Sequence, residues 1–504
     1  MPGGRMSTGQ HEEFDVVVVG GGPSGSTLST LVAMQGHSVL LLEKETFPRY
    51  QIGESLLPST IHGICHLLGV TDELAAAGFP HKRGGTFRWG ASPKPWNFSF
   101  SVSSKVSGPT SFAYQVERSK FDKILLDNAA RKGVVVRQDR TVTDVVDDAD
   151  GRARGLRYTD PDGTEHEVSA RYVVDASGNT SRIHKRVGGS RTYSDFFKSL
   201  ALFGYFENGK RMPAPYAGNI LCVAFGSGWF WYIPLSSTLT SVGAVVRRED
   251  AAKVQGDPES ALRGLIDECP MIKEYLADAT RVTTGQYGQL RVRKDYSYHH
   301  TTFWRPGMVL VGDAACFVDP VFSSGVHLAT YSALLAARSL NSVLAGRIDE
   351  RRAFDEFEAR YRREYGVFYE FLTSFYDMHV DEDSYFWTAK KVTRSSHAEL
   401  ESFVELVAGM SSTDFDLSDA ESSVLRLKQQ SAEFADAVDD MAGRQEENMA
   451  PLFRSSAVSR AMQEGSQVQT RAQLGEYAGE DVPLFDGGLV ASSDSMFWEE
   501  PHPS

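Results

Sequence analysis

The segment from Phe14 to Lys44 constrains the fold more than any other part of the sequence. It begins with an apolar run, 16–19, which is too short for a helix and rich in a β-branched residue, so it predicts a buried strand. The run leads into the pattern Gly20-x-Gly22-x-x-Gly25. In a strand–turn–helix unit, the first glycine permits a tight turn and the second lets the backbone approach a pyrophosphate. The third lets the helix pack closely against the strand.

The residues that follow complete a dinucleotide-binding pattern. A helix expected over Ser24 to Gln35 would direct its N-terminal N–H groups at the phosphates. A second buried strand, Ser38 to Leu42, ends in Glu43, where an acidic side chain can accept hydrogen bonds from an adenosine ribose. A glycine-rich turn in an ordinary βαβ unit is the alternative, and this context disfavours it. The motif by itself does not distinguish FAD from NAD.

Composition excludes several classes of function. The net charge of −14 argues against nucleic acid or an anionic membrane as the main partner. We expect no signal peptide, because residues 1–13 have no apolar core, and no membrane span, because no apolar run reaches ~18 residues. The four widely spaced cysteines predict a reduced, cytoplasmic protein without disulfides. His62, Cys65 and His66 share a predicted helix over 61–68, but a partly buried helix explains them better than a metal site does, so no metal is expected.

Three separated pieces of sequence together resemble the FAD-dependent monooxygenase superfamily, the p-hydroxybenzoate hydroxylase-like fold. They are the glycine-rich opening, the strand ending in Asp-Ala-Ser-Gly at 175–178, and the strand ending in Gly312-Asp313 with Pro320 and Gly325 after it. The resemblance implies FAD rather than NAD, with Asp313 on the ribityl chain and Gln115 and Arg118 facing the cofactor. The full set of cofactor-binding residues expected on this basis is Gly20, Gly22, Pro23, Ser24, Gly25, Glu43, Lys44, Arg49, Gln115, Arg118, Gly312, Asp313, Pro320 and Gly325.

The fold class predicted from these features is α/β, with three regions. Residues 1–80, 112–185 and 285–345 would form a discontinuous, Rossmann-like FAD-binding domain. Residues 81–111 and 186–284 would form a substrate-side domain, where alternating runs near 198–247 predict an antiparallel sheet. Residues 346–504 would form a helical C-terminal region whose last ~50 residues are polar, loosely packed or lid-like.

Within the superfamily the sequence resembles the flavin-dependent halogenases. The specific sign is Gly228-Trp229-Phe-Trp231-Tyr-Ile233-Pro234, which matches the family's W-x-W-x-I-P motif. Indoles at i and i+2 of a strand point to the same face and could separate the flavin from an organic substrate. An aromatic-rich core strand is the alternative interpretation.

Two further segments carry expected roles. Lys82 resembles the lysine that halogenases need, and such a lysine should be partly buried with a lowered pKa, whereas the alternative is an exposed basic turn. In Asp319 to His327, the resemblance implies that the backbone of Ser324 and Gly325 binds chloride, and Ser324 could equally be a plain helix N-cap.

The resemblance implies an FADH2- and O2-dependent halogenase that chlorinates an electron-rich ring of the phenol or pyrrole type, tethered to an acyl or peptidyl carrier protein, in antibiotic biosynthesis. A separate reductase would supply FADH2, and Trp229, Trp231 and Lys82 would be the catalytic residues. A carrier could dock on Arg360, Arg362 and Arg363 or on Lys390, Lys391 and Arg394, although solvated helix faces explain these clusters more simply. The rival functions are a flavin-dependent aromatic hydroxylase, a geranylgeranyl-type flavin reductase and a non-enzymatic flavoprotein scaffold.

Overall fold

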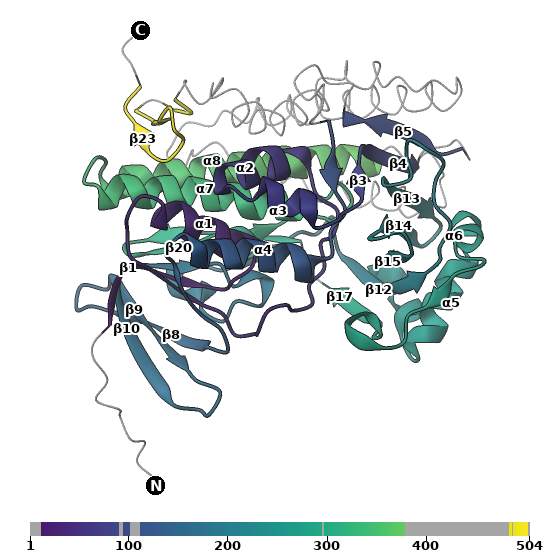
Figure 1. The fold of residues 1–504 in the computed structure, drawn as a ribbon, viewed down its shortest axis with the longest axis horizontal. Coiled ribbons are helices and arrows are strands. Elements are labelled where there is room, and N and C mark those ends of the chain that lie inside the picture. Colours follow the sequence, from purple (N-terminus) through teal and green to yellow (C-terminus); the bar gives the residue numbers. More distant parts are fainter. Residues whose placement is uncertain are drawn as a thin grey trace.

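The protein consists of two large β-sheets side by side, with a layer of long helices across one of them (Figure 1). The structure is a computed structural model that describes residues 12–89, 94–100, 111–294, 297–377, 483–485 and 487–501. Within these residues, no helix is long and apolar enough to cross a membrane, and no group of side chains could hold a metal ion. All four cysteines are buried and free, as expected from their spacing.

The first sheet is built on parallel strands, as the N-terminal motif predicts. Strand β1 pairs in parallel with β2 on one side and with β10 on the other, and β10 pairs in parallel with β20. The strand order is β19-β20-β10-β1-β2-β7, with bounds Trp304–Arg305, Met308–Leu310, Glu165–Asp175, Glu13–Val19, Val39–Leu42 and Val135–Arg137. Strands β1 and β2 lie at the centre of this sheet. Their apolar runs are buried because both faces of the sheet are covered there.

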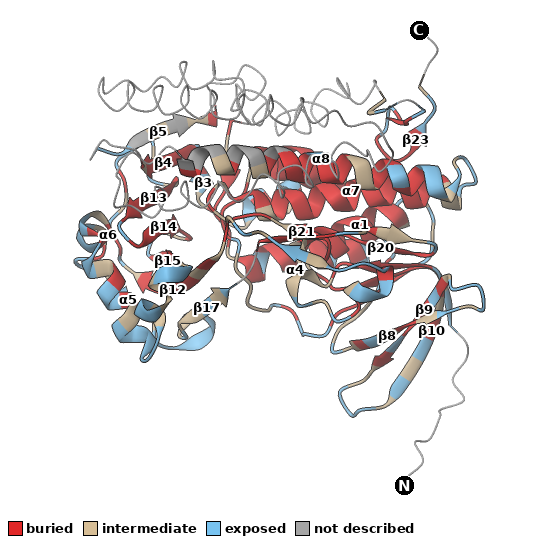
Figure 2. Ribbon diagram, turned by 180° about the vertical axis from the view of Figure 1, so that it is seen from behind, coloured by how far each residue is buried: buried red, intermediate tan, exposed pale blue. Residues whose placement is uncertain are grey.

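Helices form a layer that packs against this sheet (Figure 1). Helix α1 (Pro23–Ala33) begins immediately after the glycine-rich turn, close to the predicted start. It packs against α7 (Ser324–Leu344) and against α4 (Arg118–Arg131). Helix α7 is buried along almost its whole length and therefore forms the middle of the helical layer (Figure 2). It begins three residues earlier than the predicted start near His327, and its N-cap is Ser323 rather than Ser324.

The second sheet is mainly antiparallel, as predicted for residues 198–247. Its order is β16-β12-β15-β14-β13-β4-β5, and β17 also pairs with β12; the bounds are Thr280–Arg281, Ser199–Glu207, Leu239–Arg247, Gly228–Pro234, Ile220–Phe225, Gly84–Arg88, Trp96–Ser99 and, for β17, Arg291–Lys294. Strand β4 pairs in parallel with β13, so a segment that precedes helix α4 joins this sheet. The assignment of 285–345 to the FAD-binding domain is wrong for β17, because that strand pairs with β12.

Strand β14 contributes side chains to two hydrophobic cores, one on each of its faces. Trp229, Trp231 and Ile233 belong to the large core shared with the first sheet. Phe230 and Tyr232 belong to a smaller core under α5 (Pro258–Asp267) and α6 (Pro270–Tyr275). The period of two along the strand produces this division. The segment over 257–277 forms two helices, because Pro270 begins a new one after a break at Cys269.

Smaller elements connect the two sheets. A two-stranded pair joins β3 (His81–Lys82) to β6 (Ala113–Tyr114), and the predicted helix over 61–68 is present as a π-helical turn followed by α2. The remaining short elements are η1 (Ser59–Ile64), α2 (Cys65–Leu68), α3 (Thr71–Ala76), β8 (Thr141–Asp147), β9 (Ala153–Thr159), η3 (Gly178–Thr180), η4 (His184–Val187), β11 (Arg191–Tyr193), η5 (Arg248–Val254), η6 (Gly285–Tyr287), β18 (Tyr298–His300), η7 (Gly312–Ala314) and β21 (Cys316–Phe317).

The arginines of α8 (Glu350–Asp377) are not the exposed face that the sequence suggested. Arg360 is 7% exposed and Arg362 is 6% exposed. Each pairs with the glutamate four residues earlier and donates to backbone carbonyls, at Leu489 for Arg360 and at His300 and Thr301 for Arg362. Only Arg363 of this cluster is exposed. Lys390, Lys391 and Arg394 lie outside the described residues.

The C-terminal segment is packed rather than loose over its described part. Residues 487–501 include the short hairpin of β22 (Val490–Ala491) and β23 (Trp498–Glu499), which lies against α7 and α8 (Figure 1). Trp498 is fully buried, and its indole N–H donates to Ser339 of α7 at 2.9 Å. Arg338 and Arg360 each lie 5.3 Å from the indole ring. The expected lid is therefore, in this part, a fixed piece of the helical layer.

Candidate functional site

A cavity of about 400 Å³ runs from the glycine-rich turn to the second sheet. The turn forms its first end. Gly20 has φ +102°, and a Cβ there would lie 2.6 Å from the carbonyl oxygen of Ala176. A Cβ on Gly25 would lie 1.9 Å from the carbonyl oxygen of Gly20, so this glycine allows the close helix–strand contact that the motif predicts. Gly20, Gly22, Pro23 and Ser24 line the cavity, whereas Gly25 lies beneath it.

Glu43 lines the cavity at the end of β2, as predicted. Its carboxylate accepts hydrogen bonds from the backbone N–H of Gly21 at 2.6 Å and of Glu45 at 2.9 Å. These bonds fix the carboxylate beside the glycine-rich turn. Lys44 also lines the cavity, and its ammonium lies 3.5 Å from the hydroxyl of Thr180 on the opposite wall.

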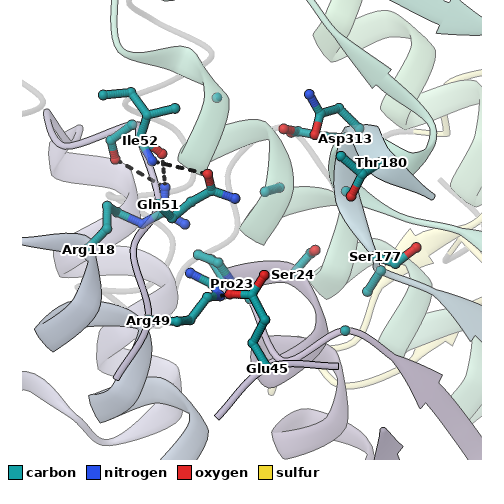
Figure 3. Close-up of a pocket in the computed structure, with 18 of the residues that line it drawn as sticks. Pro23, Ser24, Glu45, Arg49, Gln51, Ile52, Arg118, Ser177, Thr180 and Asp313 are labelled. Carbon is teal, nitrogen blue, oxygen red and sulfur yellow. Dashed lines mark hydrogen bonds and ion pairs between the residues drawn. The ribbon is translucent and has the colours of Figure 1, made fainter. Parts of the chain in front are cut away.

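A buried carboxylate holds two cavity arginines in place. Asp122 of α4 is fully buried and accepts from Arg118 at 2.7 and 2.9 Å and from Arg49 at 2.9 Å. Arg118 also donates to the carbonyl oxygen of Ile52 at 2.5 Å, on the loop that follows β2 (Figure 3). One carboxylate therefore positions both predicted cofactor-binding arginines.

Asp313 lies on the opposite wall from Arg118 (Figure 3). Burial raises the pKa of its carboxyl to about 6, although Arg118 and Arg191 favour its charged form. Gly312 has φ +58° and lies behind the wall, with its N–H donating to Ser332 of α7. Pro320 and Gly325 line the cavity nearby, so the start of α7 faces it.

The two tryptophans of β14 lie on one face, as predicted, with ring centroids 6.1 Å apart. Only Trp231 lines the cavity, and its indole N–H donates to Ser241 at 3.2 Å. Trp229 lies behind it and packs on Trp89, with centroids 6.2 Å apart. Gly243 is opposite Trp231 on β15, where a Cβ would lie 2.2 Å from the indole ring. The glycine therefore makes the space that the indole fills.

Lys82 is buried, with 2% exposure, and does not line the cavity. Its amine donates to the carbonyl oxygen of Leu56 at 3.0 Å and to the hydroxyl of Ser323 at 3.3 Å. Burial lowers the pKa of this amine to about 7, with a small opposing effect from Cys222. The exposed basic turn, which was the alternative interpretation, is therefore excluded.

The first turn of α7 links Lys82 to the cavity. Ser323, the N-cap with φ +62°, contacts the lysine, whereas Gly325, two residues later, lines the cavity. Ser324 is buried between them, and its hydroxyl donates to the carbonyl oxygen of Asp319 at 3.4 Å. The N-terminal N–H groups of a 21-residue helix thus begin at the junction between the cavity and Lys82.

The comparison with known families decides what this site is. A family model described as tryptophan halogenase matches residues 15–108 and 102–464, which is most of the chain. The chain belongs to the flavin-dependent halogenases. The family uses FADH2, O2 and halide, and a flavin reductase supplies the reduced flavin. The halogenase is 33% identical over 450 residues to a tryptophan 2-halogenase of Chondromyces crocatus, an alignment that covers 87% of this chain and 83% of that protein.

Solved structures agree with this assignment. The halogenase matches the structure of the myxobacterial chondrochloren halogenase CndH, an FAD-dependent halogenase, with a TM-score of 0.76 and 53% identity. The match covers 97% of this chain and 100% of that one. The flavin-dependent halogenase CmlS matches with a TM-score of 0.67 and 30% identity, covering 84% of this chain and 78% of CmlS.

The cavity of the halogenase fits FAD. Its glycine-rich end leaves no room for a Cβ at Gly20, and it places the N-terminus of α1 and the Arg49 guanidinium where a pyrophosphate needs positive charge. Its other end is walled by Phe203, Trp231 and Phe317, which suit a flat aromatic ring. The carboxylates of Glu43 and Asp313 lie between, where hydroxyl groups of the sugar portions can donate.

Most of the predicted cofactor-binding residues line the cavity, but Gly25, Gln115 and Gly312 do not. Gln115 is fully buried away from the lining, and its amide donates to the carbonyl oxygen of Gly218 at 3.0 Å. The prediction that Gln115 faces the cofactor is therefore not supported by its position. Asp122 was missed, although its position four residues after Arg118 on a predicted helix indicated an ion pair. Ser323 and Glu54 were missed because their partners lie far away in the sequence.

Proposed function

We propose that this halogenase chlorinates an electron-rich aromatic ring of the phenol or pyrrole type while that ring is tethered to a carrier protein. The position of Lys82 carries the proposal. The amine is buried outside the flavin cavity, yet Ser323 joins it to the same turn whose Gly325 lines that cavity. A small oxidised halogen species could pass between these two points without the organic substrate entering the flavin cavity.

When FADH2 is bound, it would activate O2, and the O2 would oxidise halide to hypohalous acid. The halogenase's own residues then have separate tasks. Trp231 closes the flavin cavity on the side of the second sheet, and Trp229 and Trp89 thicken this wall. Such a wall keeps the ring away from the flavin and disfavours direct hydroxylation.

The chloride would lie at the N-terminus of α7, against the backbone N–H groups of Ser324 and Gly325. An anion is stabilised there by unpaired N–H groups and by the helix dipole. Gly325 has no side chain that could cover its backbone N–H. The packing requires glycine here, because a Cβ at this position would lie 2.8 Å from the ring of Phe317.

Lys82 is suited to receive the oxidant because its lowered pKa leaves part of the amine neutral near pH 7. A neutral amine reacts with hypochlorous acid to form an N–Cl bond, while the O–Cl bond breaks and water leaves. Alternatively, the ammonium form holds hypochlorous acid by a hydrogen bond. Either form then delivers electrophilic chlorine to the ring, whose proton is lost.

The carrier tether rests on sequence resemblance, and no described basic cluster adds support, because Arg360 and Arg362 are buried. The test is a reaction with flavin reductase, FAD, O2 and chloride, in which the same phenol or pyrrole acid is offered free or loaded on a carrier protein. Mass spectrometry should show chlorine on the loaded substrate only. Equal chlorination of the free acid would disprove tethering, and product with bromide but not chloride would disprove the halide preference.

Lys82→Ala should abolish chlorination while reduced flavin is still oxidised. Lys132→Ala is the matched control, because it removes a lysine from an exposed position. Normal chlorination by Lys82→Ala would disprove the role of Lys82. A hydroxylated product from the wild-type protein would disprove the role of the tryptophan wall.

A further inference from the structure

Glu54 is a buried acid that the proposed mechanism does not use. It lies between β2 and η1, is 2% exposed, and accepts a hydrogen bond from the hydroxyl of Tyr205 at 2.7 Å. Its second carboxyl oxygen, Oε2, is buried and has no hydrogen-bond partner in the part of the chain that the structure describes. A carboxyl group buried with so few partners favours its protonated form. Burial accordingly raises the pKa of Glu54 to about 7.

Hydroxyl groups connect Glu54 to the flavin cavity. Tyr205 on β12 lies directly opposite Ser241 on β15, and both face the Glu54 carboxyl. The Tyr205 hydroxyl also lies 2.8 Å from the hydroxyl of Tyr50, which lines the cavity. On the other side, Ser241 accepts from the indole N–H of Trp231, a second cavity residue. Hydrogen bonds therefore join Glu54 to the cavity wall through Tyr205 and Tyr50, whereas Ser241 faces the carboxyl without a hydrogen bond to its free oxygen.

The family's reaction needs a proton at this cavity. For halide X⁻, the balanced oxidation is FADH2 + O2 + X⁻ + H⁺ → FAD + HOX + H2O. The flavin and the halide each lose two electrons, and oxygen gains four. The later transfer from HOX to an aromatic ring releases water and returns no net proton. The side chains that wall the far end of this cavity, Phe203, Trp231 and Phe317, are not acids, so a nearby acid would speed proton delivery.

We propose that Glu54 stores the proton consumed in halide oxidation and that Tyr205 and Tyr50 pass it to the flavin cavity. When Glu54 is protonated on Oε1, the 2.7 Å contact runs in the opposite direction, with the Glu54 O–H donating to the Tyr205 oxygen. In this step that O–H bond breaks as an O–H bond forms on Tyr205. The Tyr205 proton moves to Tyr50, and the Tyr50 proton moves into the cavity. The carboxylate of Glu54 remains, and solvent reloads it through Tyr50, which is the partly exposed end of the chain. The inference rests on the halide oxidation shared by the family, and not on the identity of the aromatic substrate.

The surroundings of Glu54 suit this cycle. Arg118 of α4 stabilises the carboxylate that remains after transfer, whereas Glu117 opposes it. Burial raises the pKa of both Tyr50 and Tyr205, so the tyrosines stay protonated and act as carriers rather than as acids. Three further residues face the two tyrosines: Tyr287, Arg291 and Arg293. Tyr287 packs on Tyr205 with ring centroids 4.4 Å apart, and the Arg291 guanidinium lies 3.6 Å from the centre of the Tyr50 ring.

The test uses Glu54→Gln, which keeps the shape of the side chain but cannot hold this proton. The first measurement is infrared titration of the flavin-free protein across pH about 7. Because burial also raises the pKa of Asp313 and of Asp319, the result is taken from the wild type minus Glu54→Gln difference spectrum, which should contain one protonated carboxyl band that disappears with a midpoint near that pH. Tyr232→Phe is the matched control, because its hydroxyl bonds the Lys210 carbonyl on the other face of the same sheet. This control should keep the band.

The second measurement is a single turnover of the FADH2-loaded protein with O2 and chloride, without aromatic substrate. We expect Glu54→Gln to lower the yield of hypochlorous acid at least about tenfold and to release hydrogen peroxide instead. The wild-type yield should fall as pH rises through about 7, and the variant should lose this dependence. Tyr50→Phe should keep the infrared band but lose the yield, which a purely structural role of Glu54 does not explain.

Either of two results would overturn the inference. One is a wild type minus Glu54→Gln difference spectrum that contains no protonated carboxyl band. The other is a wild-type yield and pH profile in Tyr50→Phe, and this second variant decides the matter even if Glu54→Gln does not fold. These measurements contain no aromatic substrate, so their outcome does not depend on whether the tethered-substrate proposal is correct.

Discussion

Replacing Lys82 with methionine should make the protein more stable near neutral pH while abolishing chlorination. The amine is buried, and this burial lowers its pKa from the ordinary lysine value of 10.5 to about 7. One pKa unit corresponds to about 1.4 kcal/mol, so burial of this amine costs the folded state on the order of 5 kcal/mol at low pH. Methionine has a similar length and no charge, so it removes this cost.

The sign follows from proton binding. Between pH about 7 and 10.5 the unfolded chain holds a proton on Lys82 that the folded protein lacks, so wild-type stability rises with pH over this window. Below about pH 7 the cost is fully present. The variant also loses the hydrogen bonds to Leu56 and Ser323, which costs about 1–3 kcal/mol at every pH. Comparing two pH values therefore cancels this loss.

The assay is urea unfolding of flavin-free wild type and Lys82→Met at pH about 7 and about 10. The gain in unfolding free energy from the substitution should be larger at the lower pH by roughly 3–4 kcal/mol. Lys132→Met removes an exposed lysine and should show equal effects at both values. A gain for Lys82→Met that is the same at both pH values would show that the buried amine keeps its proton, and would refute the reasoning.

Three further substitutions test other parts of the site. Gly243→Ala would place a Cβ 2.2 Å from the Trp231 ring and should lower the amount of halogenated product formed per FADH2 oxidised. Gly264→Ala has open space around it and should leave this ratio unchanged. The same ratio in both variants would contradict the proposed role of Trp231 as a wall of the flavin cavity. Asp122→Asn should weaken FAD binding at least about tenfold in a fluorescence titration, because Arg49 and Arg118 lose the charged partner that they share. Asp127→Asn, on the exposed face of α4, is the control. Unchanged FAD affinity in Asp122→Asn would contradict the role of Asp122 in positioning the two arginines. Trp498→Ala should destabilise the protein by about 3–5 kcal/mol in urea unfolding, and the half-exposed Phe485→Ala by far less; similar losses would show that the hairpin is not anchored.

Local sequence patterns predicted the parts of the fold that depend on neighbouring residues. The turn at Gly20, the first βαβ unit and the shared face of Trp229 and Trp231 follow from backbone sterics and from a strand period of two. The same is true of Asp313, which ends a short buried strand and lines the cavity.

The predictions that failed depend on contacts between distant residues. Arg360 is buried because it reaches a carbonyl 129 residues later in the chain, and Glu54 meets a tyrosine 151 residues away. Single-residue tendencies place arginine at the surface, so they cannot anticipate such a partner. The polar C-terminal stretch was expected to be loosely packed for the same reason. Its few apolar residues can anchor it only by packing against α7, and the local sequence does not show this contact.

The anchored hairpin at the carboxyl end has a practical consequence for handling this enzyme. Trp498 is fully buried, so a group inserted directly after β23 begins within a few residues of the core. The amino end differs, because Glu12, the first described residue, is exposed and precedes the central strand by a single position. Fusions and surface immobilisation therefore belong at the amino end, where they leave the packing between the hairpin and the two long helices intact.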